Sequence, residues 1–125
     1  MKTSLFIILL LNASILLAQS NNKRRVFLFT DGENNPTLIE QKQILKSDEA
    51  GCSERDMIIE TYIIAKTNKK ILSKYNISAV PFTFLLIGKD GHVALRSYKV
   101  IPKAQLFALI DGMPMRRDEM QRRRN

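Results

Sequence analysis

Cys52 is the side chain whose chemistry could most directly support a nucleophilic or redox reaction, and it is the only cysteine in the sequence. Asp48, Glu49 and Glu54 surround it with negative charge, which disfavours the thiolate. Only Arg55 opposes them. A single cysteine cannot form an intramolecular disulfide, so we predict a free structural thiol, with an intermolecular disulfide as the alternative.

Metal chemistry has little support in the composition. His92 is the sole histidine, and it lies in a turn region beside Asp90. Protein zinc and iron sites usually combine several histidine, cysteine or carboxylate ligands. We therefore predict no metal and no other cofactor.

The first twenty residues have the pattern of a secretory signal peptide. Lys2 gives a positive start, an apolar run extends from Leu5 to Leu17, and residues 18–20 offer small side chains for cleavage. A permanent membrane anchor is the alternative, but a membrane span needs about 20 apolar residues. We predict a signal peptide over residues 1–20, a periplasmic or secreted location, and no transmembrane span after cleavage.

Length and charge bound the exported chain. Twenty lysines and arginines stand against twelve aspartates and glutamates, a net charge of +8 that becomes +7 once Lys2 is removed. We predict one domain over 21–117 and a basic tail over 118–125 that is a frayed helix or disordered. In an exported protein this charge favours a solvated surface, a protein partner or an anionic envelope or glycan partner over nucleic acid.

The first half of the domain is predicted to alternate strands and helices. A strand is expected over 25–30, followed by a helix that begins at Asn35-Pro36 and ends at Gly51. A second strand, nearly continuous in apolar character and therefore internal, is expected over 57–64, with a short helix over 68–75. Strand, helix and strand in this order make a right-handed parallel unit.

The second half is predicted to be a hairpin followed by a helix. A proline precedes the apolar run 82–87, the run stops at the turn 88–91, and an alternating strand covers 92–98. The last helix, over 102–113, places on one face Leu106, Leu109, Ile110 and Met113. The order βαβαββα resembles the thioredoxin-like core. We therefore expect an α/β fold with a central mixed four-stranded sheet and helices on both faces.

The resemblance to thioredoxin-like proteins directs attention to the junction of the first strand and first helix. In redox-active members this junction holds the nucleophilic cysteine, because amide dipoles there stabilise a thiolate. Here the junction, residues 30–36, contains no cysteine, serine or histidine. In such proteins a cis-proline faces this loop, which makes Pro81 the cis-proline candidate.

The same topology predicts where scattered charged residues meet. The second strand begins, the first hairpin strand ends and the last helix ends at one pole of the sheet, opposite residues 30–36. One charged cluster is expected there, made of Arg55, Asp56, Lys89, Asp90, Asp111 and Arg116. Pairs of this kind usually anchor elements of the fold, and the alternative is a partner-binding or catalytic site.

Four segments together resemble the bacterial branch of the DUDES-domain family: 54–56, 82–91, 95–97 and 106–120. The Lys-Asp-Gly and Ile-Asp-Gly-Met-Pro-Met-Arg runs are the distinctive parts, and the similarity covers essentially the whole mature chain. The resemblance implies a thioredoxin-like domain of unknown function, generally without a cysteine pair. It also implies animal relatives among extracellular-matrix and sushi-repeat proteins.

Two functions follow as hypotheses. The first is an exported, non-catalytic thioredoxin-fold module that binds a protein or an anionic envelope or glycan partner. The missing nucleophile favours it, so no catalytic residue is assigned. The alternative is a thioredoxin- or peroxiredoxin-like enzyme of the cell envelope that uses Cys52 or the polar residues Arg55, Lys89, Asp90, Asp111 and Arg116.

Overall fold

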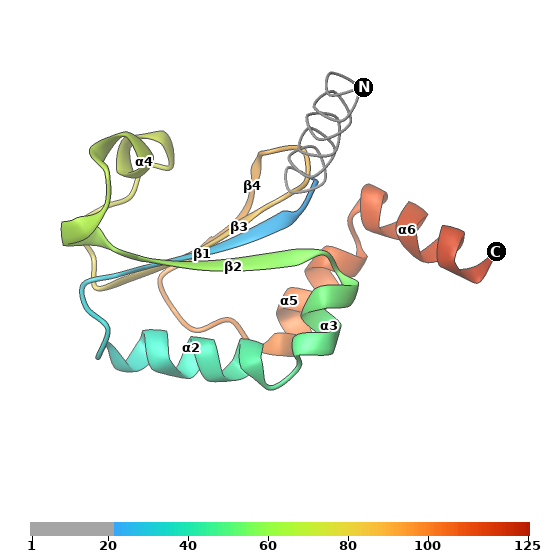
Figure 1. Cartoon of the computed structure of the whole chain (residues 1–125), viewed down its shortest axis with the longest axis horizontal. Helices are drawn as coiled ribbons and strands as arrows, with labels where there is room; N and C mark the ends of the chain where they lie inside the picture. Colours follow the sequence, from blue (N-terminus) through green and yellow to red (C-terminus); the bar gives the residue numbers. More distant parts are fainter. Residues whose placement is uncertain (1–21) are drawn as a thin grey trace, which may run out of the picture.

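A computed structural model describes residues 22–125, in which four strands form one mixed sheet with the order β2-β1-β3-β4 (Figure 1). The strands are β1 (Arg24–Thr30), β2 (Met57–Ile63), β3 (Phe82–Ile87) and β4 (Val93–Ser97). Strand β1 pairs in parallel with β2 and antiparallel with β3, and β3 pairs antiparallel with β4. The predicted mixed four-stranded sheet is confirmed. The predicted signal peptide lies outside the described residues.

The two central strands are the continuous apolar runs of the sequence. Strand β3 is buried along its whole length, and β1 is buried except at Arg25. The prediction that β2 is internal is wrong, because β1 takes β3 as its second neighbour and leaves β2 at the edge. Its residues are accordingly only partly buried. An apolar run reports burial of the strand faces, whereas the pairing of strand edges depends on the rest of the chain.

The helices are α2 (Pro36–Lys46), α3 (Glu49–Glu54), α4 (Lys69–Lys74), α5 (Lys103–Asp111) and α6 (Pro114–Arg124), with a short 3-10 turn at Ile64–Lys66. The prediction of one helix ending at Gly51 is wrong, because the helix stops at Lys46 and a new one begins at Glu49. Asp48 caps the second helix by accepting a hydrogen bond from the Gly51 amide. Gly51 is needed for packing, since a Cβ there would lie 2.7 Å from the Phe107 ring.

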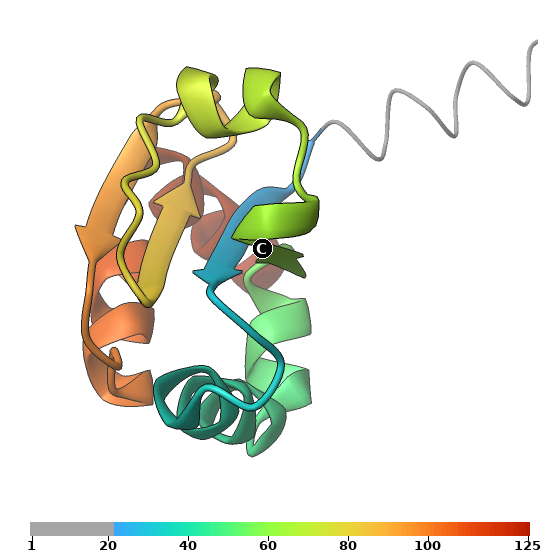
Figure 2. The same ribbon diagram turned by 90° about the vertical axis from the view of Figure 1, so that its left-hand side faces the viewer.

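The helices cover both faces of the sheet, as the sequence predicted (Figure 2). Helices α2 and α5 bury Leu38, Leu45, Leu106 and Ile110 against one face, in a core that includes Val26, Leu28, Phe84 and Leu86. The other face holds a smaller core of Phe27, Phe29, Leu85 and Ile87, covered in part by Ile71, Leu72 and Tyr75. Leu109, expected on the buried face of α5, is 39% exposed.

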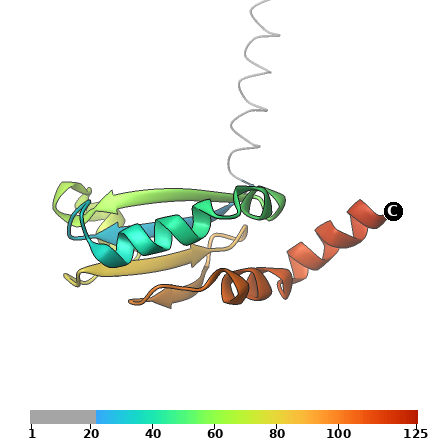
Figure 3. The ribbon, with the colours of Figure 1, turned by 90° about the horizontal axis from the view of Figure 1, so that it is seen from below.

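The C-terminal segment departs from the prediction of a frayed or disordered tail. Residues Pro114–Arg124 form α6, which leads away from the sheet toward the C-terminus (Figure 3). Arg116, in its first turn, is almost completely buried. A proline at the first helical position and a buried arginine fix the start of this helix. Within the described part of the chain no helix is long and apolar enough to cross a membrane.

Candidate functional site

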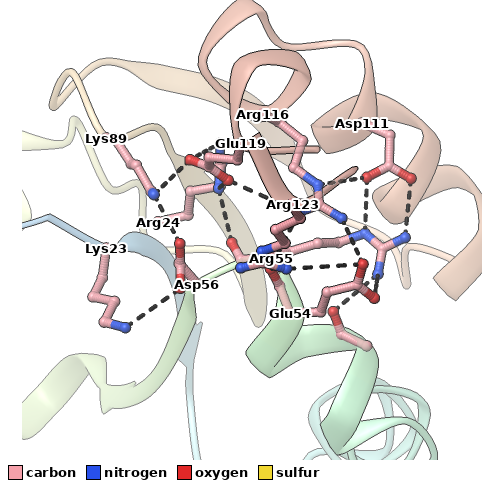
Figure 4. A network of polar contacts seen from close by, with 11 residues as sticks. Lys23, Arg24, Glu54, Arg55, Asp56, Lys89, Asp111, Arg116, Glu119 and Arg123 are labelled. Atoms are coloured by element: carbon pink, nitrogen blue, oxygen red, sulfur yellow. Dashed lines mark hydrogen bonds and ion pairs between the residues drawn. The ribbon is translucent and has the colours of Figure 1, made fainter. Parts of the chain in front are cut away.

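Charged side chains from β1, α3, α5 and α6, and from the segments before β2 and after β3, converge at one pole of the sheet (Figure 4). The strand register explains the convergence: Arg24, at the start of β1, pairs with Met57 at the start of β2, and Arg25 pairs with Ile87 at the end of β3. Helix α5 ends and α6 begins at the same pole. Of the six residues predicted to meet there, the structure brings together Arg55, Asp56, Lys89, Asp111 and Arg116. We call the connected group of ion pairs around these residues the charge network.

Asp111, at the end of α5, joins two arginines. Arg55 donates to both of its carboxylate oxygens, from Nε at 3.1 Å and from Nη2 at 2.9 Å. Arg116 donates from Nε to Asp111 Oδ1 at 3.0 Å and from Nη2 to Glu54 Oε1 at 3.1 Å. The Arg55 guanidinium also lies 3.9 Å from the centre of the Phe107 ring. Asp111 therefore joins the end of α3 to both C-terminal helices.

Glu119, one turn into α6, joins two further cations. Arg24 donates to its two carboxylate oxygens at 3.2 Å each, and Lys89 Nζ lies 2.5 Å from Glu119 Oε1. The same Lys89 nitrogen donates to Asp56 Oδ2 at 2.9 Å. The side chains of Arg24 and Lys89 are 1% and 6% exposed, so these pairs lie largely out of water. Glu119 connects α6 to the start of β1 and to the turn after β3.

Asp90, the sixth predicted residue, lies outside the charge network. Its carboxylate accepts a hydrogen bond from the His92 amide at 3.0 Å, and its side chain is 62% exposed. Hydrogen bonding from His92 lowers the pKa of this carboxyl. In the turn 88–91 the chain directs Lys89 inward and leaves Asp90 to close the turn, as short aspartate side chains commonly do.

Arg24 and Glu119 carry much of the charge network, and reasoning from the sequence missed both. Arg24 stands one residue before the strand predicted over 25–30, although it is the first residue of β1, which has a partner strand on each side. Glu119 was assigned to the tail, although it stands three residues after Arg116 on the same side of a helix. The three-residue spacing between Arg116 and Glu119 was the one signal in the sequence that could have placed Glu119 in the network.

The network lowers the pKa of its two central carboxylates, Asp111 and Glu119. Burial opposes ionisation of Asp111, but hydrogen bonds from Arg55 and Arg116 outweigh it and hold its pKa below the ordinary value. Burial likewise opposes ionisation of Glu119, and hydrogen bonds from Lys89 and Arg24 lower its pKa. Each carboxylate is thus a stable anion that already has cationic partners, which leaves neither as a free general base.

Asp56 occupies a strained backbone position. Its φ is 52°, in the left-handed region that residues other than glycine adopt at a cost. This residue turns the chain from α3 into β2, and its carboxylate reaches Lys89 at 2.9 Å and Lys23 at 3.5 Å. Burial opposes ionisation of Asp56, but the hydrogen bond from Lys89 and the positive charges of Lys89 and Lys23 outweigh it. The pKa of Asp56 is therefore lowered.

Residues 16–119 match the model of a family described as a domain of unknown function, DUF4174. The chain belongs to this family. Among curated proteins, none matches this DUF4174 sequence. The more specific resemblance to DUDES-domain proteins and their animal relatives stays a prediction.

Solved structures place the DUF4174 domain in the thioredoxin-like fold. Thioredoxin-2, a component of malaria parasite protein secretion machinery, is 16% identical with a TM-score of 0.58, over 74% of this chain and 84% of that chain. The N-terminal domain of PilB from Neisseria gonorrhoeae is 25% identical with a TM-score of 0.51, over 73% of this chain and 77% of that chain. A malarial protein is 16% identical with a TM-score of 0.56, over 72% of this chain and 96% of that chain. The predicted thioredoxin-like class is confirmed.

In the DUF4174 domain the junction between β1 and α2 is closed by its own hydrogen bonds. Asn35 Oδ1 accepts from the Thr37 and Leu38 amides, at 2.9 and 3.2 Å, and so occupies the free N-terminus of α2. Asn35 Nδ2 donates to Asp31 and to the Pro81 carbonyl. The amides that would stabilise a thiolate in a redox protein are thus satisfied by the loop itself.

Pro81 faces this junction but its peptide bond is trans, so the cis-proline candidate is wrong. The Pro81 carbonyl accepts from the Asp31 amide at 3.0 Å, which continues the pairing of β1 with β3. Trans is the lower free-energy form of an X-Pro bond, and this extended entry into β3 does not require the other form.

Cys52 lies inside α3, 5% exposed, and it is free. Burial raises the pKa of its thiol, Asp48 raises it further, and Arg55 opposes them. The thiol is 3.7 Å from the Leu45 carbonyl as a weak donor. Within residues 22–125 no three His, Cys, Asp or Glu side chains converge in an arrangement suited to a metal ion. Cys52 is therefore a buried side chain whose environment favours the neutral thiol.

Proposed function

We propose that this protein is an exported, non-catalytic thioredoxin-fold module that binds a protein or an anionic envelope or glycan partner. The observation that carries the proposal is Asn35, which caps α2 at the position where redox-active members of the fold keep a nucleophile. The loop around it offers neither a thiol nor free helix amides.

Two further features support a binding role. The single thiol is buried and its pKa is raised, so little thiolate exists near neutral pH. The carboxylates of the charge network are paired with arginine and lysine, which suits an anchor for α6 better than acid-base catalysis. An excess of positive charge and the extracellular relatives that the family resemblance implies favour an anionic partner outside the cytoplasm.

Turnover assays on the wild type and on Cys52→Ser test the catalytic half of this proposal. We expect that neither protein reduces insulin disulfides with dithiothreitol or consumes hydrogen peroxide faster than the buffer. The rate of Cys52 alkylation against pH should give an apparent pKa above the ~8.5 of free cysteine. Activity that depends on Cys52, together with an apparent pKa well below that value, would overturn the proposal.

Binding to an anionic polysaccharide, measured by calorimetry at increasing salt, tests the other half. The affinity should fall as salt screens the exposed arginines of α6. Arg122→Gln and Arg124→Gln together should weaken it further, because both side chains lie on the exposed end of that helix. A salt-independent affinity would contradict the proposed electrostatic recognition.

A further inference from the structure

A cavity of about 440 Å³ opens beside the edge strand β2, between this strand and helices α2 and α3. Its volume lies in the range of small-molecule sites. Leu45, Cys52, Met57 and Ile59 form its apolar side. It lies on the α2 face of the sheet, whereas most ion pairs of the charge network lie at the pole.

The apolar side of the cavity exists because α2 does not cover the edge of the sheet. Ile59 pairs in register with Val26, so both side chains point to the face that α2 packs against. Val26 is fully buried there, but Ile59, one strand farther out, is 38% exposed. Met57, two residues earlier on the same face, is half-buried against the core. The edge strand therefore offers unused apolar surface next to buried Leu45.

Three lysines stand around this apolar surface: Lys23, Lys42 and Lys46. Lys42 and Lys46 are one helical turn apart on α2, and both are exposed. Within residues 22–125 neither forms an ion pair, in contrast to Lys23, which lies 3.5 Å from Asp56. Two carboxylates also line the cavity, Glu49 and Asp56, and the second of these already pairs with Lys89. Positive charge is therefore in excess beside an apolar floor.

We propose that this cavity binds a fatty-acid anion, with the acyl chain on Met57 and Ile59 and the carboxylate between Lys42 and Lys46. The inference rests on the proposed function of a binding module and names its class of ligand. Packing the acyl chain against an apolar surface is favourable in proportion to the apolar area that it removes from water. The two lysines attract the single negative charge of the carboxylate at the end of the acyl chain. A neutral Cys52 in the floor suits the apolar chain and adds no opposing charge.

Calorimetric titration with decanoate tests the site. Decanol, which has the same chain length and no charge, and hexanoate, which has the same charge and a shorter chain, are the control ligands. Decanoate should bind more tightly than both, because decanol lacks the charge and hexanoate covers less of the apolar floor. Hexaglutamate, an acidic peptide without an apolar chain, should not bind at this site. If decanol binds as tightly as decanoate, or hexaglutamate binds and decanoate does not, the proposed ligand class is wrong.

Paired variants locate the binding. Lys42→Gln with Lys46→Gln should weaken decanoate binding by about tenfold. Lys69→Gln with Lys70→Gln makes the same charge change on exposed lysines of α4 and should leave the affinity unchanged. Ile59→Asn should also weaken binding, whereas Ile39→Asn, at a comparably exposed isoleucine on α2, should not. Equal losses in a variant and its matched control would overturn the assignment to this cavity.

The two proposals fail separately. Absence of decanoate binding to a wild-type protein that is also inert toward disulfides and peroxide would remove this inference and leave the non-catalytic module. Decanoate binding together with Cys52-dependent turnover would keep the cavity as a fatty-acid site and remove the non-catalytic role.

Discussion

At the end of β1 the chain turns through residues 30–35 and holds itself with hydrogen bonds between near neighbours, such as Asn35 to Thr37 and Thr30 to Gly32. At the start of β1 the chain is held by ion pairs between segments far apart in sequence, such as Arg24 to Glu119 and Arg55 to Asp111. The first pole is a local capping structure, in which Asn35 accepts hydrogen bonds from the first amides of α2. The second is a long-range charge network that attaches α6.

The difference shows that a thioredoxin-like fold can form without a cysteine at the junction of β1 and α2. A strand-to-helix turn needs little more than a capping side chain and a backbone hydrogen bond that closes it; Asn35 supplies the cap, and its amide donates to the Gly32 carbonyl at 3.3 Å. Attaching a helix beyond the sheet needs contacts that no local sequence can provide. Among the described residues, the two buried charged side chains, Arg24 and Arg116, both lie at the pole away from the redox position of the fold.

Acidification should have the largest effect, because it protonates Asp56, Asp111 and Glu119 together and leaves buried cations unpaired. Burial opposes ionisation of all three, but their hydrogen bonds to lysine and arginine lower each pKa in the folded chain. Such groups contribute stability that is fully present above their unfolded pKa of about 4 and is lost as the pH falls through the folded pKa. The free energy of unfolding should therefore fall steeply below about pH 4.

Urea unfolding at a series of pH values measures this dependence by circular dichroism. Glu119→Gln removes one of the three groups, so its unfolding free energy should vary less with pH than that of the wild type in the same window. Equal slopes would show that Glu119 titrates alike in both states, and the charge network would lose one of its two central anions.

Arg116→Ala should follow, with a loss of about 3 kcal/mol in the free energy of unfolding. Its side chain is 1% exposed and joins Asp111 to Glu54, both of which are partly exposed and can take water in its absence. Arg117→Ala is the control, because Arg117 is the next residue of α6 and is exposed. It should change the free energy by less than about 0.5 kcal/mol. Similar losses in both variants would mean that α6 is not anchored through Arg116.

Arg55→Ala should cost somewhat less, about 2 kcal/mol, because Arg55 is more exposed than Arg116 and its loss leaves Asp111 paired with Arg116. Arg55→Lys should recover little of this, since lysine cannot make the two-pronged contact with Asp111 or lie flat on Phe107. Urea unfolding gives the free energy of unfolding, and calorimetry with the anionic polysaccharide gives the binding affinity. Unchanged stability with lost partner binding would turn the charge network from an anchor into a binding site.

Asn35→Ala should have the smallest effect, about 1 kcal/mol, as for the loss of other helix caps. The variant loses the cap on Thr37 and Leu38 and the contact with the Pro81 carbonyl. Asn34→Ala, an exposed neighbour in the same loop, is the matched control and should be close to neutral in urea unfolding. A cost for Asn35→Ala as large as that for Arg116→Ala would remove the contrast between a local pole and a long-range pole.

Much of the fold followed from local patterns, and the misses share a cause. The apolar runs at β1 and β3, the Asn35-Pro36 helix start and the turn at 88–91 depend on nearest neighbours in the chain, so they could be predicted. The break between α2 and α3 was missed because Gly51 was interpreted as a helix end, whereas it lies inside α3, where a Cβ would be 2.7 Å from the Phe107 ring. A glycine near a helix end signals a stop or a close contact, and only the packing partner distinguishes them.

The candidate site divides in the same way. The strand directions were enough to gather Arg55, Lys89 and Arg116 at one pole, since parallel and antiparallel connections fix which ends of the strands meet. They were not enough to include Arg24 and Glu119 or to exclude Asp90. A side chain joins such a network only if it points inward. Successive side chains of a helix point about 100° apart, and in the turn 88–91 Lys89 reaches Asp56 whereas Asp90 bonds to the nearby His92 amide.

The sequence by itself determined the order of the four strands and the absence of cysteine, serine and histidine from residues 30–36, because both depend on which residues occur in which order. The tertiary structure alone decided that β2 lies at an edge, that Cys52 is buried, and that Lys42 and Lys46 stand beside uncovered Ile59. Burial and strand pairing arise from competition among all segments for the same surfaces. No segment carries the outcome of that competition in its own residues.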